Sequence, residues 1–177
     1  MKKYELTTET KVVSGHTLYR IRALVAFGSV DTGELGGWIE NETNLAQYGN
    51  VWVYGNAQVY GNAQVCGNAQ VYGDAEVCGN AWVYGNAQVY GNAQVCGNAR
   101  VCDNAAIMTI SHIGSRFGTT TFFVLKNGKI GVQCGCFYGD IDEFAAKVEQ
   151  THGNNQHGKA YKLAIELAKL RLQTRKE

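Results

Sequence analysis

Hydrophobic and polar positions alternate within a six-residue unit from Val53 to Met108, as in Gly-Asn-Ala-Gln-Val-Tyr. Valine fills the aliphatic position from Val53 to Val101 and Ile107 follows it, while alanine stands two residues before it from Ala57 to Ala105. Alternation with period two predicts a short strand that buries one face. Gly-Asn between strands supplies the residue types that tolerate a bent corner. Each unit is therefore predicted to form one strand and one corner.

A hairpin through this corner would reverse the order of buried and exposed positions from one strand to the next, and the repeat keeps that order. A coil of three strands that stacks on the next coil is the simplest arrangement that preserves it. Backbone hydrogen bonds then run between coils. The asparagine column from Asn56 to Asn104 is broken only by Asp74. We attribute it to corner geometry in preference to a recognition ladder. An irregular leading coil is expected over residues 41–51, where Leu45 and Val51 fit the small-residue position and Gln47 does not fit the aliphatic one.

The ends of such a stack need caps. We therefore divide the chain into an N-terminal strand-rich cap over residues 1–40, a β-helix over residues 41–108 and an α+β cap over residues 109–177. Residues 19–25 are expected to form a strand in the first cap. Residues 119–125 and 129–134 predict a hairpin across Asn127-Gly128 in the second.

Two helices are expected after this hairpin. Asp140 with Glu143 predicts a capping box that opens a helix ending near Gly153. The second helix is expected to run from Lys159 to Gln173. It carries three leucines on one side, Leu163, Leu167 and Leu170. We expect the two helices to cover the hairpin or the face of a helix.

The Gly-Asn-Ala-x-Val-Tyr repeats resemble the hexapeptide-repeat family of left-handed β-helices. Together with Leu35-Gly36-Gly37-Trp38-Ile39-Glu40, they resemble bacterial and phage proteins labelled polymer-forming cytoskeletal proteins or acyltransferases. The resemblance extends into the tail, through residues 113–116 and 134–137. It implies a mainly β fold, a left-handed parallel β-helix of about eighteen residues per coil, with a small α+β C-terminal cap. Because related β-helices form trimers, it also implies a homo-oligomer, with a homotrimer as the first expectation.

A coil of that length stacks outward side chains one coil apart on three faces. The most apolar face then carries Trp52, Tyr54, Tyr72, Tyr90 and Met108. An aromatic stripe of this kind predicts a contact surface, either for the C-terminal segment of the same chain or for another subunit. The alternative is that tyrosines simply suit exposed strand positions.

Charge and composition narrow the class of partner. Sixteen Lys+Arg against fifteen Asp+Glu leave a formal charge of +1, which indicates neither nucleic acid nor an anionic membrane. No apolar signal segment or membrane-length apolar run is present in the sequence, which predicts a cytoplasmic protein, in a bacterial cytosol or an infected host cell. The six cysteines are accordingly expected to stay thiols.

Catalysis, cofactors and metals are not expected. Hexapeptide acyltransferases, which the array resembles, use a histidine near the coil, and here all four histidines lie outside the regular repeats: His16, His112, His152 and His157. Cys78 and Cys96 should stack one coil apart, about 4.8 Å, which would allow a metal or a disulfide, but no histidine or carboxylate completes a familiar ligand set. The alternative function is an acyl-CoA-dependent acyltransferase that uses His112 or His152 at a subunit interface.

The candidate ligand site lies after the array. Ser115, Arg116 and the hydroxyls of Thr119, Thr120 and Thr121 gather near one Gly-bent turn, which suits an anion, and His152 adds a polar group at a helix end. Alternatively, the threonines are ordinary strand residues and Arg116 is a solvated charge. The sequence thus favours a non-enzymatic oligomeric binding protein. Its C-terminal cap would recognise a host protein, as an inhibitor of host defence, or an anionic small molecule such as a signalling nucleotide.

Overall fold

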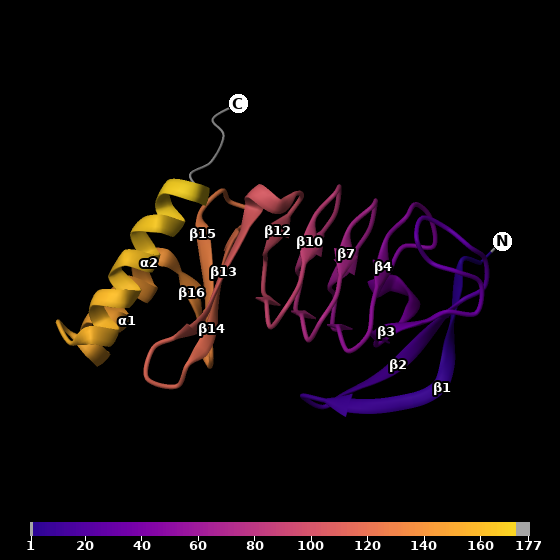
Figure 1. The fold of residues 1–177 in the computed structure, drawn as a ribbon, viewed down its shortest axis with the longest axis horizontal. Helices are drawn as coiled ribbons and strands as arrows, with labels where there is room; N and C mark the ends of the chain where they lie inside the picture. Colours follow the sequence, from indigo (N-terminus) through magenta and orange to yellow (C-terminus); the bar gives the residue numbers. More distant parts are fainter. Residues whose placement is uncertain (1, 173–177) are drawn as a thin grey trace.

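The computed structural model describes residues 2–172, which form an elongated molecule of three parts (Figure 1). An N-terminal cap, a stack of parallel coils, and a cap of one sheet and two helices follow one another along the long axis. The predicted mainly β fold of stacked parallel coils with an α+β cap is confirmed. No helix among the described residues is long and apolar enough to cross a membrane.

Short parallel strands build the coils and form three stacks. One stack contains β3 (Leu35–Ile39), β5 (Gln58–Val59), β8 (Glu76–Val77) and β11 (Gln94–Val95). The second contains β4 (Trp52–Val53), β7 (Gln70–Val71) and β10 (Gln88–Val89). The third contains β6 (Gln64–Val65), β9 (Trp82–Val83) and β12 (Arg100–Val101). Gln70 lies opposite Gln88 and Glu76 opposite Gln94, so residues eighteen apart stack, as expected.

The alternation of the repeat explains which side chains point into the interior of the coils. Every repeat valine from Val53 to Val101, and every repeat alanine from Ala57 to Ala99, is at most 1% exposed. The corner glycines from Gly55 to Gly97 have φ between 56° and 74°, a conformation that other residues adopt at a cost. At Gly67 a Cβ atom would also lie 3.0 Å from the backbone nitrogen of Gly85. Conformation and close stacking therefore both require glycine there.

Asparagines at the corners form hydrogen-bonded ladders along the stack. Asn62 Nδ2 donates to Asn80 Oδ1 at 3.1 Å, and Asn68 Nδ2 donates to Asn86 Oδ1 at 3.2 Å. Asn56 donates in the same way to Asp74 at 3.2 Å. The amide groups of this column thus support the corners, in agreement with the corner interpretation.

The leading coil differs from the one expected. β3 already pairs in parallel with β5, so stacking begins within the segment assigned to the N-terminal cap. Leu45 lies opposite Val65 and therefore occupies an aliphatic position, not the small-residue position predicted for it. The register changes before Trp52, which lies opposite Gln70. The leading coil therefore has extra residues between Leu45 and Trp52. One of these is Gln47, whose Oε1 accepts a hydrogen bond from the backbone nitrogen of Lys3 at 2.8 Å.

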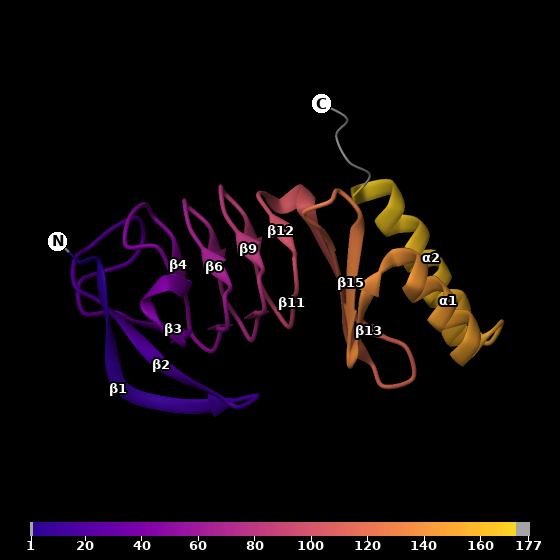
Figure 2. The same cartoon turned by 180° about the vertical axis from the view of Figure 1, so that it is seen from behind.

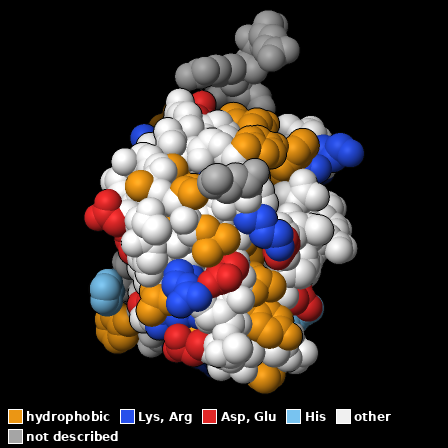
Figure 3. Space-filling model, turned by 90° about the vertical axis from the view of Figure 1, so that its right-hand side faces the viewer, with side chains coloured by type: hydrophobic (Ala, Val, Ile, Leu, Met, Phe, Trp, Pro, Cys, Tyr) orange, Lys and Arg blue, Asp and Glu red, His pale blue; other side chains and the backbone are white. Residues whose placement is uncertain are grey.

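An antiparallel hairpin of β1 (Tyr4–Val13) and β2 (His16–Ala23) precedes the coils and lies along one side of them (Figure 1). β2 corresponds to the strand predicted over residues 19–25, and β1 was not predicted. Between β3 and β4 lies the 3-10 turn η1 (Glu42–Asn44). The N-terminal end presents side chains of both charges beside hydrophobic ones (Figure 3). This end is therefore closed by a mixed surface, not by an open coil.

The C-terminal cap begins with the 3-10 turn η2 (Asn104–Ala106) and continues into an antiparallel sheet of β13 (Ile107–Ile113), β14 (Gly118–Val124), β15 (Ile130–Cys134) and β16 (Phe137–Asp140). β14 and β15 form the predicted hairpin. Two helices, α1 (Ile141–His152) and α2 (Gln156–Leu172), lie on the side of the sheet away from the coils (Figure 2). The predicted capping box is confirmed: Asp140 accepts from the Glu143 nitrogen, and Glu143 Oε2 accepts from the Asp140 nitrogen.

The second helix turns its three leucines to solvent. Leu163, Leu167 and Leu170 are 67%, 51% and 77% exposed. The helix instead packs through other residues, namely Tyr161, Ala164, Ile165, Ala168 and Leu172. Small alanines let the helix approach the sheet and α1 closely, which turns the leucines to solvent. Gln173, the expected last residue of this helix, lies outside the described residues.

One pair of cysteines is oxidised, contrary to the expectation of six thiols. Cys78 and Cys96 form a disulfide, whereas Cys66, Cys102, Cys134 and Cys136 are free. The cause is the stacking itself, which places the two Cα atoms 4.6 Å apart, within the range that a disulfide spans.

Candidate functional site

A pocket of about 330 Å³ opens in the C-terminal cap between the sheet and the helices. Its walls come from the β13–β14 turn, the β15–β16 turn, α1 and the start of α2. The polar side chains among its lining residues are Ser115, Arg116, Thr119, Cys134, Cys136, Lys147, Thr151, His152 and Tyr161. The apolar ones are Ile113, Phe137, Phe144 and Val148. Segments far apart in the sequence therefore build one site.

Glycine allows the β13–β14 turn to approach α2. Gly114 has φ of +76°, and a Cβ atom on it would lie 2.1 Å from the hydroxyl oxygen of Tyr161. Only glycine permits both this conformation and this contact. The turn thus holds Ser115 and Arg116 over the pocket, next to the Tyr161 ring.

Three basic side chains line the pocket: Arg116, Lys147 and His152. No acidic side chain is found among its described lining residues. Arg116 is exposed and forms no ion pair with any residue that the structure describes. His152 ends α1, where the helix dipole favours a positive charge. The pocket mouth is therefore suited to an anion.

Aromatic side chains form the pocket floor. The ring of Phe144 meets that of Phe137 at 5.2 Å and that of Tyr161 at 5.5 Å, measured between centroids. The His152 ring stacks on Tyr161 at 5.7 Å. Apolar rings below basic groups would suit a molecule with an apolar body and an anionic end.

Tyr161 connects the floor to the half-buried thiol of Cys134. Its hydroxyl lies 3.6 Å from Cys134 Sγ, which also accepts a hydrogen bond from Thr120 Oγ1 at 3.1 Å. Burial, and next the hydrogen bond with Cys134, raise the pKa of Tyr161 to about 12. The hydroxyl is thus protonated at neutral pH and offers the pocket a neutral hydrogen-bonding group.

Four of the six predicted ligand residues line this pocket: Ser115, Arg116, Thr119 and His152. The other two, Thr120 and Thr121, are buried at 0% and 1% exposure and do not line it. Thr120 contacts Cys134, and Thr121 Oγ1 accepts a hydrogen bond from the Gln94 nitrogen at 3.1 Å, at the last coil. Successive strand residues point to opposite faces, so Thr120 cannot share a surface with Thr119, and Thr121 is covered by the last coil.

Several pocket residues were not predicted, among them Lys147 and Tyr161. Helical spacing offered a signal for part of this set. Phe144, Lys147, Val148, Thr151 and His152 follow one another at the intervals of a single helix face. The place of Tyr161 depends on how α2 packs, which the local sequence does not specify.

The aromatic stripe is divided between the two caps and solvent. Trp52 is fully buried under the N-terminal cap, where its ring meets Tyr4 and Phe27, so this cap covers it and not the C-terminal segment or the other subunit that was predicted for the stripe. The Tyr54 hydroxyl lies 3.3 Å from Ser29 Oγ. Met108 packs against the core of the C-terminal cap. Tyr72 and Tyr90 stack at 5.4 Å between ring centroids, and Tyr90 is 53% exposed.

Comparison with known families identifies the coils. Three segments, residues 69–85, 75–91 and 93–107, match the model of the YdcK beta solenoid repeat. No curated protein matches the chain. The matched segments lie within the stacked coils and the turn that follows them, and they include no pocket residue. The scaffold of this chain is therefore similar to the YdcK beta solenoid repeat.

Proposed function

We propose that this chain is a non-enzymatic binding protein. In this proposal the solenoid is a rigid scaffold and the pocket of the C-terminal cap holds a small anionic ligand. One observation carries it: Arg116, Lys147 and His152 line a pocket of about 330 Å³ that has an aromatic floor. Retention of the ligand without turnover would make the protein a sponge for that ligand.

The size and chemistry of the pocket define the class of ligand. Its volume is at the lower end of the range of about 300–1,000 Å³ that is common for small-molecule sites. A phosphate or carboxylate group would accept hydrogen bonds from Arg116, with Ser115 and Thr119 beside it. A ring or short chain would then lie against Phe144 and Tyr161. A signalling nucleotide is one member of this class.

Titration calorimetry of the parent and of Arg116→Ala tests the proposal. The ligand is first identified by thermal-shift screening with mononucleotides, organic phosphates and organic carboxylates. A charged hydrogen bond contributes about 1.5 to 3 kcal/mol, so we expect the variant to bind roughly 10- to 150-fold more weakly. Arg100→Ala is the matched control, because Arg100 lies over the Trp82 ring on the solenoid, away from the pocket. Equal affinities of parent and Arg116→Ala would refute the assignment.

The second candidate is acyl transfer, which the place of His152 in the pocket favours. A histidine beside a bound acyl-CoA could take a proton from an acceptor amine or hydroxyl. Assay with acyl-CoA and a panel of acceptors separates the two functions. Turnover that disappears in His152→Ala would establish the enzyme, whereas ligand retention without turnover supports the binding protein.

We also propose that the protein assembles into a homo-oligomer through the Tyr72–Tyr90 stack. The exposed tyrosine rings support this, since aromatic side chains are enriched in interfaces. A trimer with parallel solenoid axes would place these faces toward one another.

A further inference from the structure

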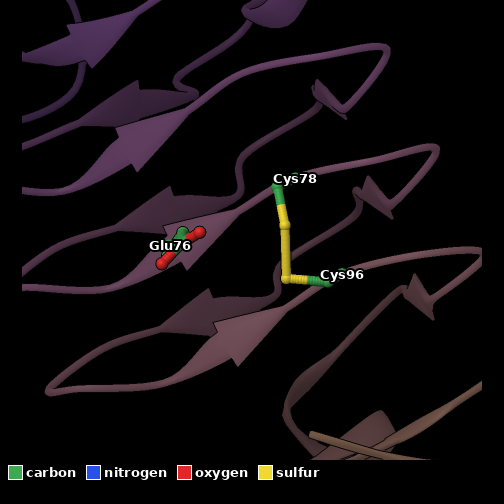
Figure 4. Close-up of side chains that lie close together, drawn as sticks. All are labelled: Glu76, Cys78 and Cys96. Atoms are coloured by element: carbon green, nitrogen blue, oxygen red, sulfur yellow. A yellow bond between two sulfur atoms is a disulfide. The ribbon is translucent and has the colours of Figure 1, made fainter. Parts of the chain in front are cut away.

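Glu76, Cys78 and Cys96 lie together on one outer face of the solenoid (Figure 4). Glu76 and Cys78 are two residues apart, so both side chains point outward from the same coil. Cys96 lies beside Cys78 on the next coil. A carboxylate oxygen and the two sulfur atoms all lie within 4.8 Å of one another. Among the described residues, this is the one group of three potential metal ligands from histidine, cysteine, aspartate or glutamate.

We propose that Glu76, Cys78 and Cys96, when the two cysteines are reduced, form a binding site for a thiophilic divalent metal ion of the zinc class. Zinc accepts thiolate and carboxylate ligands at about 2.3 Å and about 2.0–2.2 Å. In a tetrahedral arrangement those atoms lie roughly 3.5–3.8 Å apart. The two sulfurs, which are bonded to each other in the disulfide, must separate to that distance after reduction, and the carboxylate oxygen already lies within 4.8 Å of both. Three protein ligands leave a fourth position for water or an external ligand.

Neighbouring side chains orient the Glu76 carboxylate. The Tyr60 hydroxyl donates a hydrogen bond to Oε1, and Gln94 Nε2 donates to Oε2 at 3.3 Å. Tyr60 is 6% exposed and packs with Leu18 of the N-terminal hairpin. Such outer-shell hydrogen bonds fix the direction of a metal-binding carboxylate.

Two other outward cysteines provide a natural contrast. Cys66 and Cys102 lie in one outward column, but Tyr84 separates them because each step along the column is eighteen residues. They are therefore two coils apart, about 9.6 Å at the usual strand spacing, which is too far to share one ion. The two columns differ in this separation and in the presence of Glu76.

The disulfide is the metal-free state in this proposal. A dithiol reductant gives two electrons and two protons to the Cys78–Cys96 bond, which yields two thiols and the oxidised reductant. A divalent ion then binds both sulfurs as thiolates and releases two protons to solvent. Oxidation of the thiols by a disulfide reverses these steps and expels the ion. Occupancy would thus depend on the redox state.

Cobalt(II) is a direct probe, because thiolate ligands give it a charge-transfer absorption band. The full chain is reduced with a dithiol, freed of reductant without oxygen and titrated with cobalt(II). We expect one ion per chain, displacement by zinc(II) and release of two protons. The oxidised chain should give no band. Absence of a band in the reduced parent would overturn the proposal.

Matched variants locate the ion. Cys78→Ser and Cys96→Ser should abolish one-to-one binding of cobalt(II). Loss of an outer-shell partner lowers metal affinity roughly 10- to 100-fold, and Glu76→Gln, which removes a direct ligand, should lower it by more than that. Tyr60→Phe should weaken it within that range. The double variant Cys66→Ser/Cys102→Ser should bind like the parent. Circular dichroism checks that each variant is folded. Unchanged binding in Glu76→Gln, or loss of binding in the Cys66→Ser/Cys102→Ser variant, would contradict the site.

Discussion

Val71 and Gln70 are neighbours on β7, yet their side chains lie on opposite faces of the coil wall. Val71 is fully buried, whereas Gln70 is partly exposed. Val71→Asp would place an unpaired carboxylate in the core, which costs several kcal/mol. We expect it to abolish cooperative thermal unfolding of the array, and Gln70→Asp to change the melting temperature little. Equal shifts of the two variants in circular dichroism would contradict the assigned alternation.

Tyr161 should make the stability of the protein depend on alkaline pH. An unfolded tyrosine has a pKa of about 10, whereas in the folded chain burial raises the pKa of Tyr161 to about 12. The folded state therefore favours the neutral phenol, and this stabilisation is fully present below about pH 10. It is lost as pH rises from about 10 to about 12.

Denaturant titrations of the parent and Tyr161→Phe across this range measure the effect. The free energy of unfolding of the parent, minus that of the variant, should fall as the pH rises. A difference that stays constant with pH would exclude this contribution.

The residue patterns show what the sequence could predict and why. The burial of Val71 followed from alternation alone, because that signal is local. The burial of Trp52 did not, since Tyr4 and Phe27 cover it from distant parts of the chain. The Gly-bent turn indicated Arg116, which lines the pocket. Thr120 does not line it because its strand neighbour Thr119 points the other way, and Thr121 does not because the last coil, distant in sequence, covers it.

At the scale of elements, α1 depends on its first residues. Asp140 accepts hydrogen bonds from the nitrogens of Asp142 and Glu143. Asp140→Ala should lower the free energy of unfolding by about 1 kcal/mol, as loss of an N-cap does. Asp140→Ser is the matched control, because serine can cap the helix but cannot pair with Lys129 as Asp140 does. Chemical denaturation should rank the parent and the serine variant close together and the alanine variant lowest.

Element boundaries with a chemical signal were predicted well. Asn127-Gly128 marked the β14–β15 hairpin and Asp140 with Glu143 marked the start of α1. The sequence did not show which face α2 buries, because Leu163, Leu167 and Leu170 satisfy a helical period as well as the residues that do pack. Which of two possible faces is buried is decided by the shape of the sheet and of α1. That information is not local to α2.

For the whole molecule, the proposed assembly makes Tyr72 a sensitive position. Tyr72→Glu would set a charge in the middle of the tyrosine face, next to the exposed Tyr90 ring. We expect this change to lower the mass seen in sedimentation while the circular dichroism of the coils stays the same. Gln88→Glu, a charge on the neighbouring β10, tests whether any negative charge has this effect. An unchanged mass for Tyr72→Glu would remove the tyrosine stack from the assembly.

Because residues eighteen apart stack on one another, the number of coils sets the length of the molecule. Each coil beyond the hairpin adds one strand spacing, about 4.8 Å, between the N-terminal cap and the pocket at the other end. Val13 of the hairpin and Cys78 pack against the same cluster, so a coil duplicated on the C-terminal side of Cys78 should lengthen this separation by that step and leave both end structures as they are. The distance between the N-terminal cap and the pocket is thus set by a whole number of coils. Gene duplication can change that number one coil at a time.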